Sequence, residues 1–335
     1  MLKYTDTREL ISLDILGHRV RGTYHRSFDD RTSSWMSGTC ADRPAVLFLN
    51  SLALPRAATG DSAVYWADAF ARLGYPTFRF DLPGLGDSDG QASTDLLDFI
   101  NGGGFAPAAA GISKELVERG GYSGVVLVGH CAGAVTASFA AAAFKKCKGM
   151  ILLDPYFYLP VAKRPESREK LSGWARHSAL GRPLSNLFDR VKHLKLFLRG
   201  SALPGNANTR LLRKWKELSS TGLPILLFKA PGIKAQGSKP RVGEFDYLEH
   251  VRKLAGRKGN LVMKSIEDSD HSFANRAGRE AVRRDAEGWM TAHFPLTNPQ
   301  AHTKAVSFPS AGNKWNGSSR AMVATPNPDC ALEGR

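Results

Sequence analysis

One short stretch of this sequence, residues 124–134, constrains the fold more than any other. It reads GVVLVGHCAGA, so an apolar run leads into the letters GHCAG at 129–133, and an alanine-rich segment follows. A continuous apolar run is typical of a strand that is buried on both faces, and alanine is the strongest helix former. The sequence therefore predicts that Cys131 stands on a tight turn between a buried strand and a helix.

Strands and helices alternate along most of the chain. Two short alternating runs, 9–16 and 18–25, predict an opening hairpin. Further strands are expected at 45–50, 76–81, 124–129, 149–154, 224–230 and 260–266, with helices at 62–74, 111–121, 132–144 and within 275–292. This order predicts an α/β fold, with a mostly parallel sheet of about eight strands flanked by helices.

The alternation breaks after the sixth strand and again after the last helix. Residues 155–221 hold 14 Lys and Arg against 4 Asp and Glu, in a chain whose formal net charge is +15. We expect 1–154 and 222–294 to form one core, and 155–221 to form a basic cap insertion. Residues 295–335 are rich in Pro, Asn, Ser, Ala and Gly and predict a flexible tail.

Composition argues against several classes of protein. No apolar run of about eighteen residues exists and the first residues lack an apolar signal core, so we expect a cytoplasmic protein without a membrane span. The four cysteines have no close paired spacing, which argues against a disulfide framework or a metal site. No nucleic-acid-binding signature accompanies the basic segment, and we expect neither a nucleic-acid partner nor a cofactor.

Three stretches, taken in order, resemble motifs of the α/β-hydrolase fold. The turn at 129–133 resembles its nucleophile elbow, with cysteine where serine is usual. RFDLPGLGDSDG at 79–90 resembles its glycine-rich turn, and DSDHSF at 268–273 resembles its histidine loop. The resemblance covers the chain from about residue 9 to residue 294 and implies the α/β-hydrolase fold.

The resemblance also implies roles for individual residues. Cys131 would be the nucleophile, and its place at the start of a helix favours the thiolate over the thiol. His271 would be its base. An oxyanion hole would take one backbone N–H from Ala132 and a second from Ser51 or Leu52, in the loop after the third strand.

The acid that orients the histidine is the open question. The superfamily usually carries it just after the seventh strand, where this chain has no acid until Glu244 and Asp246. Asp154 ends the sixth strand, an alternative place in some members of the fold, and we favour it over the other two. A cysteine and histidine pair can also act without an acid. Asp81 we expect to bond the backbone of its own turn.

A thiol at the elbow favours acyl transfer over hydrolysis. Its attack produces a thioester, so exchange with a thioester donor is nearly isoenergetic. Families of this fold with a cysteine elbow include dienelactone hydrolases, polyhydroxyalkanoate synthases and the acyl or aminoacyl shuttles of nonribosomal peptide assembly lines. The stretch from Gly60 to Gly90 also resembles the hydrolases associated with exosortase systems.

We therefore expect a biosynthetic enzyme that moves an acyl group from coenzyme A, or from the phosphopantetheine arm of an acidic carrier protein, to an acceptor. The basic cap suits either donor, because both are negatively charged. Hydrolysis of an ester, lactone or thioester is the alternative, and a ligand-binding protein without catalysis is a second. The basic segment can also be a solvated surface with no partner.

Overall fold

The computed structural model describes residues 7–27, 34–36, 42–159, 203–231, 245–256 and 260–296. Met1–Asn298 forms one compact unit. Of the predicted basic cap, the structure describes 155–159 and 203–221, and residues 160–202 lie outside the described residues. The predicted tail lies outside them from residue 297 on. The division into core, cap and tail therefore stays a prediction.

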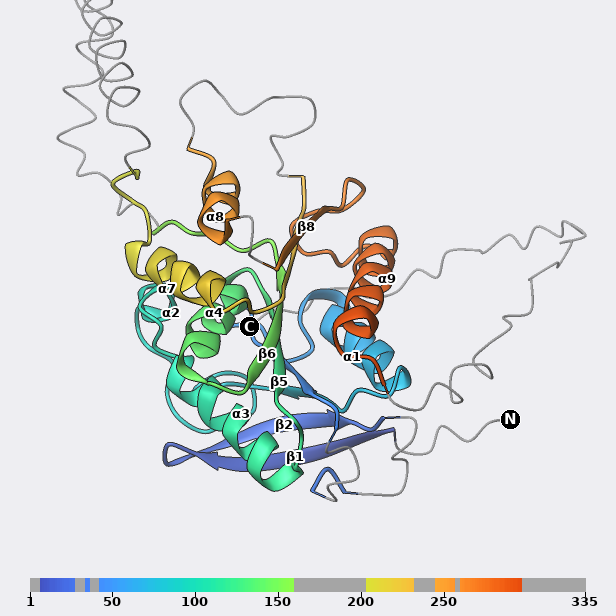
Figure 1. The fold of residues 1–335 in the computed structure, drawn as a ribbon. Coiled ribbons are helices and arrows are strands. Elements are labelled where there is room, and N and C mark those ends of the chain that lie inside the picture. The colour runs from blue at the N-terminus through green and yellow to red at the C-terminus, as the bar shows by residue number, and fades with distance from the viewer. Residues whose placement is uncertain are drawn as a thin grey trace, which may run out of the picture. The chain divides into compact units, whose positions relative to one another are not determined.

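The described residues form one eight-stranded sheet with the order β1-β2-β4-β3-β5-β6-β7-β8 (Figure 1). The antiparallel pairs are β1 with β2 and β2 with β4, and all other neighbours are parallel. The strands are β1 Arg8–Ile15, β2 His18–His25, β3 Ala45–Leu49, β4 Thr77–Phe80, β5 Val125–His130, β6 Cys147–Leu153, β7 Ile225–Lys229 and β8 Leu261–Ser265. The predicted mostly parallel α/β sheet is confirmed, and each predicted strand is present within three residues of its expected ends.

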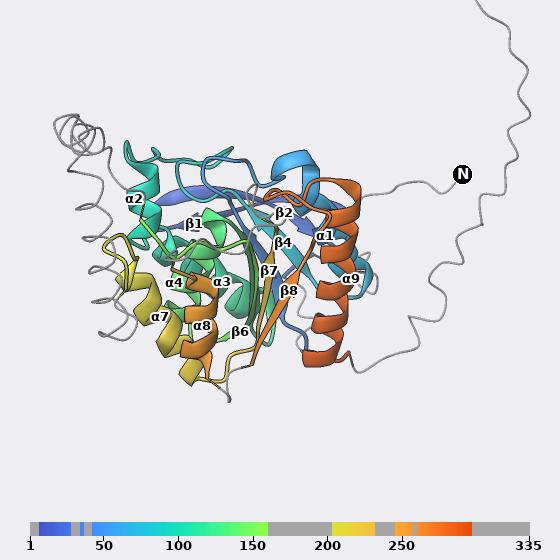
Figure 2. The same ribbon diagram turned by 90° about the horizontal axis from the view of Figure 1, so that it is seen from above.

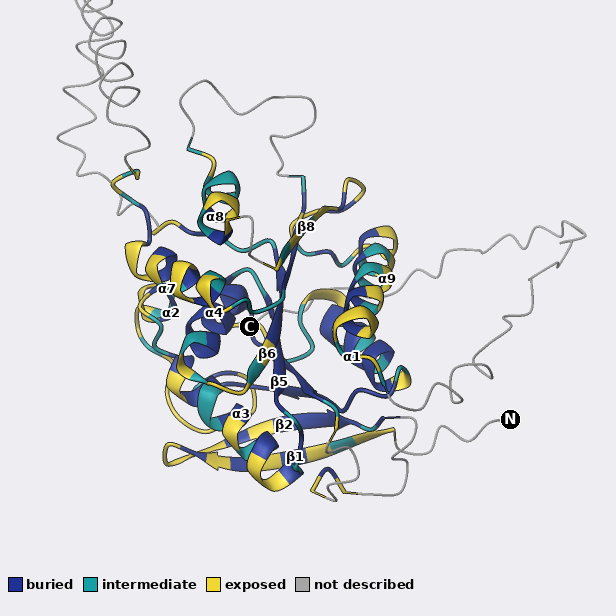
Figure 3. Ribbon diagram, in the orientation of Figure 1, coloured by how far each residue is buried: buried dark blue, intermediate teal, exposed yellow. Residues whose placement is uncertain are grey.

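Helices cover both faces of this sheet, as the two ribbon views show (Figures 1 and 2). Alternate residues of a strand point to opposite faces, so Val46 and Phe48 of β3 join one apolar cluster and Leu47 joins the other. On one face lie α1 Ser62–Arg72 and α9 Arg276–His293; on the other lie α2 Leu96–Asn101, α3 Ala106–Gly120, α4 Ala132–Ala143, α7 Thr209–Ser220 and α8 Tyr247–Ala255. The central strands are buried between these layers (Figure 3).

The sequence analysis missed α2, α7 and α8 and placed the start of α3 five residues too late. Helix α7 is the most informative omission, because its solvent side is basic while Trp215 and Leu211 are buried on the side that packs on α4 and α8. Strands β6 and β7 are parallel, and a parallel pair needs a crossover that is usually a helix. Helix α7 supplies that crossover within the range that we assigned to an insertion.

The strands β5, β6 and β8 are parallel to one another, so their carboxyl ends share one edge of the sheet. The loops that leave this edge contain Cys131, Asp154 and His271. In open α/β sheets ligands bind outside the carboxyl ends of the strands. The fold thus brings together three residues that are far apart in the sequence.

Among the described helices, none is long and apolar enough to span a membrane.

Candidate active site

Cys131 occupies the sharp turn between β5 and α4. Its backbone has φ 52° and ψ −115°, a conformation that side chains rarely adopt, and it precedes the first residue of α4. The glycines on either side leave no room for a side chain. A Cβ on Gly129 would lie 2.3 Å from the carbonyl oxygen of Gly133, and one on Gly133 would lie 2.6 Å from that of Asn50. The turn therefore holds the thiol at the carboxyl edge of the sheet, at the start of a helix.

His271 and Asp154 lie against each other at the same edge. His271 Nδ1 is 2.5 Å from Asp154 Oδ2, and the two residues are supplied by the loops after β8 and β6. Asp154 has φ 45° and donates its backbone N–H to the carbonyl of Phe228, 2.8 Å away. This contact fixes the carboxylate next to the imidazole.

The two other candidate acids stand apart from this pair. Asp246 accepts a hydrogen bond from the backbone N–H of Glu249 at 2.9 Å, so it caps the amino end of α8. Glu244 lies outside the described residues. Of the two candidates that the structure describes, Asp154 is the one in contact with His271.

The pKa of His271 is raised from 6.5 to about 10. The hydrogen bond with Asp154 is the largest cause of this raised pKa. The interaction with Cys131 raises the pKa further, and burial of the ring opposes both effects. Both partners favour the imidazolium, since each can carry a negative charge. The imidazole of His271 is therefore held next to a carboxylate that favours its protonated form.

His130, the middle residue of the elbow, holds the histidine loop in place. Its Nε2 lies 2.7 Å from the backbone carbonyl oxygen of His271, and the two rings are 4.9 Å apart between centroids. Burial lowers the pKa of His130, so its ring is neutral and Nε2–H is the donor to that carbonyl. The sequence alone contains no signal for this role of His130, because the contact joins residues 141 positions apart.

The loop after β3 is fastened beside the elbow by buried polar contacts. Asn50 accepts from the backbone N–H of Leu82 at 2.8 Å and donates to Asp81 at 2.9 Å. The fully buried Asp81 also accepts from the backbone N–H and the guanidinium of Arg56. Asp81 bonds Asp87 N–H at 3.2 Å within its own turn, so the prediction that Asp81 bonds the backbone of that turn is confirmed.

The expected oxyanion donors border the elbow from two elements. Ala132 begins α4, so its N–H has no acceptor within the helix. Ser51 and Leu52 follow β3, the strand that pairs with β5; Ser51 is buried, and Leu52 is exposed with φ 51°. These positions are compatible with an oxyanion hole, which stays a prediction for all three residues.

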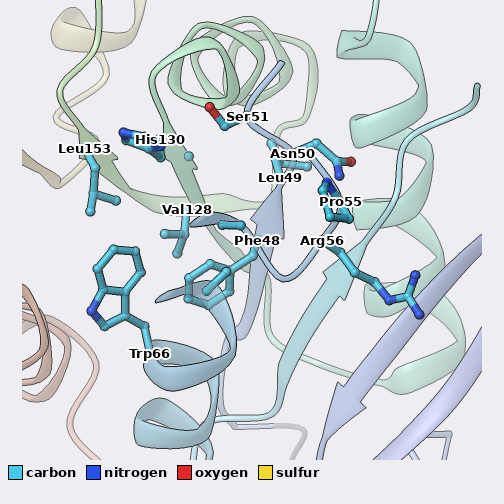
Figure 4. A pocket seen from close by; sticks show the side chains of 13 residues that line it. Phe48, Leu49, Asn50, Ser51, Pro55, Arg56, Trp66, Val128, His130 and Leu153 are labelled. Atoms are coloured by element: carbon cyan, nitrogen blue, oxygen red, sulfur yellow. The ribbon is translucent and has the colours of Figure 1, made fainter. Parts of the chain in front are cut away.

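A small cavity lies behind the turn, between the loop after β3 and helix α1 (Figure 4). It has a volume of about 20 Å³, and Asn50, Ser51, Trp66 and His130 are among the residues that line it. This volume holds about one water molecule. The cavity is therefore too small to hold an organic substrate.

The sequence of the chain matches the model of a known family over residues 46–285, described as the alpha/beta hydrolase family. The chain belongs to this family. No curated protein matches it at a significant level. In the part of the chain that the structure describes, no cluster of His, Cys, Asp and Glu is arranged to hold a metal ion.

Solved structures with the same fold include three that bear on function by their names. The esterase PF2001 of Pyrococcus furiosus is 13% identical with a TM-score of 0.54, and the match covers 85% of this chain and 90% of that one. The alpha/beta hydrolase GrgF of Penicillium sp. sh18 is 14% identical (TM-score 0.54; 86% and 99% covered). The thioesterase domain from the curacin biosynthetic pathway is 16% identical (TM-score 0.50; 85% and 100% covered). At these identities the likeness establishes the fold, and membership of the family supports an enzyme with a hydrolase-type activity.

Proposed function

We propose that the protein is an acyl-transfer enzyme whose nucleophile is Cys131. The observation that carries the proposal is the contact of His271 Nδ1 with Asp154 Oδ2 at 2.5 Å, at the same edge of the sheet as the sharp turn of Cys131. A base between a nucleophile and an orienting carboxylate is the general arrangement of covalent acyl-transfer catalysis. Cys131 also occupies a sharp turn between a strand and a helix, the position of the nucleophile in the α/β-hydrolase fold.

The first half of the reaction forms an acyl-enzyme. The Cys131 thiolate attacks the carbonyl carbon of the donor, and the negative charge moves to the carbonyl oxygen. Backbone N–H groups of Ala132 and of Ser51 or Leu52 stabilise that oxyanion. When the carbonyl re-forms, the bond to the donor sulfur breaks, and the His271 imidazolium gives its proton to the departing thiolate.

The second half passes the acyl group to an acceptor. His271, now neutral, takes a proton from the attacking group, and the thioester bond to Cys131 breaks to regenerate the thiolate. Asp154 keeps the Nδ1–H of His271 pointing toward itself, so Nε2 faces the reacting atoms through both steps. No cofactor takes part in this scheme.

A thioester donor on coenzyme A or on a carrier protein fits this nucleophile best. One thioester replaces another, so little free energy is lost when the acyl group moves to Cys131. The exposed basic side chains of α7, which include Arg213 and Lys216, support a negatively charged donor. Hydrolysis of an ester or thioester is the second candidate, and membership of the alpha/beta hydrolase family favours it.

The experiment that tests the proposal is intact-protein mass spectrometry after incubation with butanoyl-coenzyme A. We expect one butanoyl adduct on the native protein and none on Cys131→Ala. Cys147→Ala is the matched control, because burial raises the pKa of the Cys147 thiol to about 12 and leaves it unreactive. An absent adduct, or one that persists in Cys131→Ala, would contradict the proposal. Release of the adduct by an added amine or thiol, compared with its release by water, distinguishes transfer from hydrolysis.

A further inference from the structure

The hydroxyl of Tyr156 is a buried polar group that has no hydrogen-bond partner among the described residues. Its oxygen is shielded from solvent, and no described residue forms a hydrogen bond with it. The ring packs at the margin of the core and lies 5.6 Å from the ring of Tyr158. Buried hydroxyls in native proteins nearly always have a hydrogen-bond partner, so a buried hydroxyl that lacks one requires an explanation. A hydrogen bond that forms only when a substrate is bound provides one.

Tyr156 leaves the sheet beside the nucleophile. It follows Asp154 by two residues, and Leu153 at the end of β6 accepts the backbone N–H of Cys131 at 2.9 Å. The segment is held from its other side by the backbone N–H of Asn208, which donates to Phe157 at 2.9 Å. Burial raises the pKa of Tyr156, and a charge on Cys131 raises it further. Tyr156 therefore lies on the segment that leaves the sheet next to the turn of Cys131, and its hydroxyl stays protonated, as a donor.

The position of Tyr156 relative to the oxyanion hole decides which part of a substrate it can reach. Strand β5, which ends at the elbow, lies between β3 and β6. The loop with Ser51 and Leu52 follows β3, whereas Tyr156 follows β6. Tyr156 therefore lies on the β6 side of the elbow, and the expected oxyanion donors of the loop after β3 lie on the β3 side.

We propose that Tyr156 selects the acyl group by donating a hydrogen bond to an oxygen or nitrogen on its second or third carbon. This inference rests on the proposed acyl-transfer function of Cys131. It assigns the substrate to the class of hydroxy-, oxo- or aminoacyl thioesters and excludes plain alkanoyl thioesters as the preferred donors. A site with a buried donor disfavours an analogue that lacks the acceptor, since the donor is then left unpaired.

The test compares donors of equal length. The rate of Cys131 acylation is measured with the N-acetylcysteamine thioesters of butanoate, 2-hydroxybutanoate, 3-hydroxybutanoate and 3-oxobutanoate. For the native protein we expect at least one polar donor to react about tenfold faster than butanoate, the effect of one hydrogen bond. In Tyr156→Phe that preference should vanish, because the rates with the polar donors should fall toward the rate with butanoate. Tyr158→Phe, which removes an exposed hydroxyl two residues away, is the matched control and should keep the preference.

Four results would overturn the inference. The first is a native protein without preference for any polar donor. The second is an equal loss of rate for all four donors in Tyr156→Phe, because the hydroxyl would then act on the reacting carbonyl. The third is the absence of any adduct on Cys131, which would overturn the proposed function as well. The fourth is a Tyr156→Phe variant that forms adducts with all four donors and keeps the native preference. That result would overturn the inference and leave the proposed function standing.

Discussion

Cys131 donates its backbone N–H to the carbonyl oxygen of Leu153 at 2.9 Å. This hydrogen bond joins the turn of Cys131 to the last residue of β6, directly before Asp154. Cys131 and Asp154 are therefore set relative to each other by the pairing of two adjacent parallel strands rather than by a flexible loop. A site built on such elements is held more precisely than one built on loops.

The first prediction concerns the choice of acceptor. In Cys131→Ser the acyl-enzyme becomes an oxygen ester, which exchanges less readily with thiols, so a larger share of product should be free acid. The measurement is the ratio of transferred product to free acid, by chromatography, with a fixed concentration of a thiol acceptor. The same ratio in both proteins would contradict our account of why cysteine stands at this position.

The second prediction concerns the acid. Asp154→Asn should slow acylation by about 100-fold or more, because the amide no longer favours the imidazolium or the correct tautomer. Asp246→Asn is the matched control: asparagine also caps helices well, so both stability and rate should change little. Stopped-flow measurement of acylation distinguishes the two. A small effect at Asp154 would indicate a cysteine and histidine pair that needs no acid.

The third prediction concerns pH. The pKa of His271 is about 10 in the folded protein, above its ordinary value of 6.5. A raised folded pKa stabilises the protein fully below pH 6.5, and this contribution is lost as the pH rises through 10. The free energy of unfolding of the native protein, minus that of His271→Gln, should therefore decrease over this range. Titration of the imidazole by NMR should give a lower pKa in Asp154→Asn, where the largest cause is removed. An unchanged value would exclude Asp154 as that cause.

The sequence sufficed for those parts of the site and fold that depend on local pattern. The apolar run of β5, the glycines around Cys131 and the histidine loop can all be recognised without a structure. The choice of Asp154 over Asp246 could not be settled, because it depends on β6 lying between β5 and β7 in the sheet. The same holds for His130 and Tyr156, whose surroundings are made by distant segments. Helix α7 was not predicted because the basic residues drew attention to charge. The helical spacing of its buried residues Leu211, Trp215 and Leu218 was overlooked for that reason.

The fourth prediction concerns His130 as a positioning residue. His130→Ala removes the donor to the backbone carbonyl of His271, so the histidine loop should move and acylation should slow by about tenfold. His130→Gln retains a donor and should recover part of the rate. The pKa of His271 in both variants, measured by NMR, is the second readout, because a merely structural change would leave it unaltered. Equal losses of rate in the two variants would argue against the hydrogen bond as the cause.

The last prediction concerns the basic side chains of α7. Arg213 and Lys216 are exposed, so their reversal to Glu should leave the buried side of the helix undisturbed. If these charges attract a negatively charged donor, the second-order rate with butanoyl-coenzyme A should fall in the double variant, while the rate with the uncharged N-acetylcysteamine thioester should not. Raising the ionic strength should likewise lower the native protein's rate with butanoyl-coenzyme A relative to its rate with the uncharged thioester, since exposed charges are screened beyond about 10 Å at 0.1 M salt.

An equal loss of rate with both donors in the double variant would indicate damage to the helix. If neither salt nor charge reversal distinguishes the donors, the basic face of α7 is a solvated surface, and the preference for a coenzyme A or carrier-bound donor loses its electrostatic support.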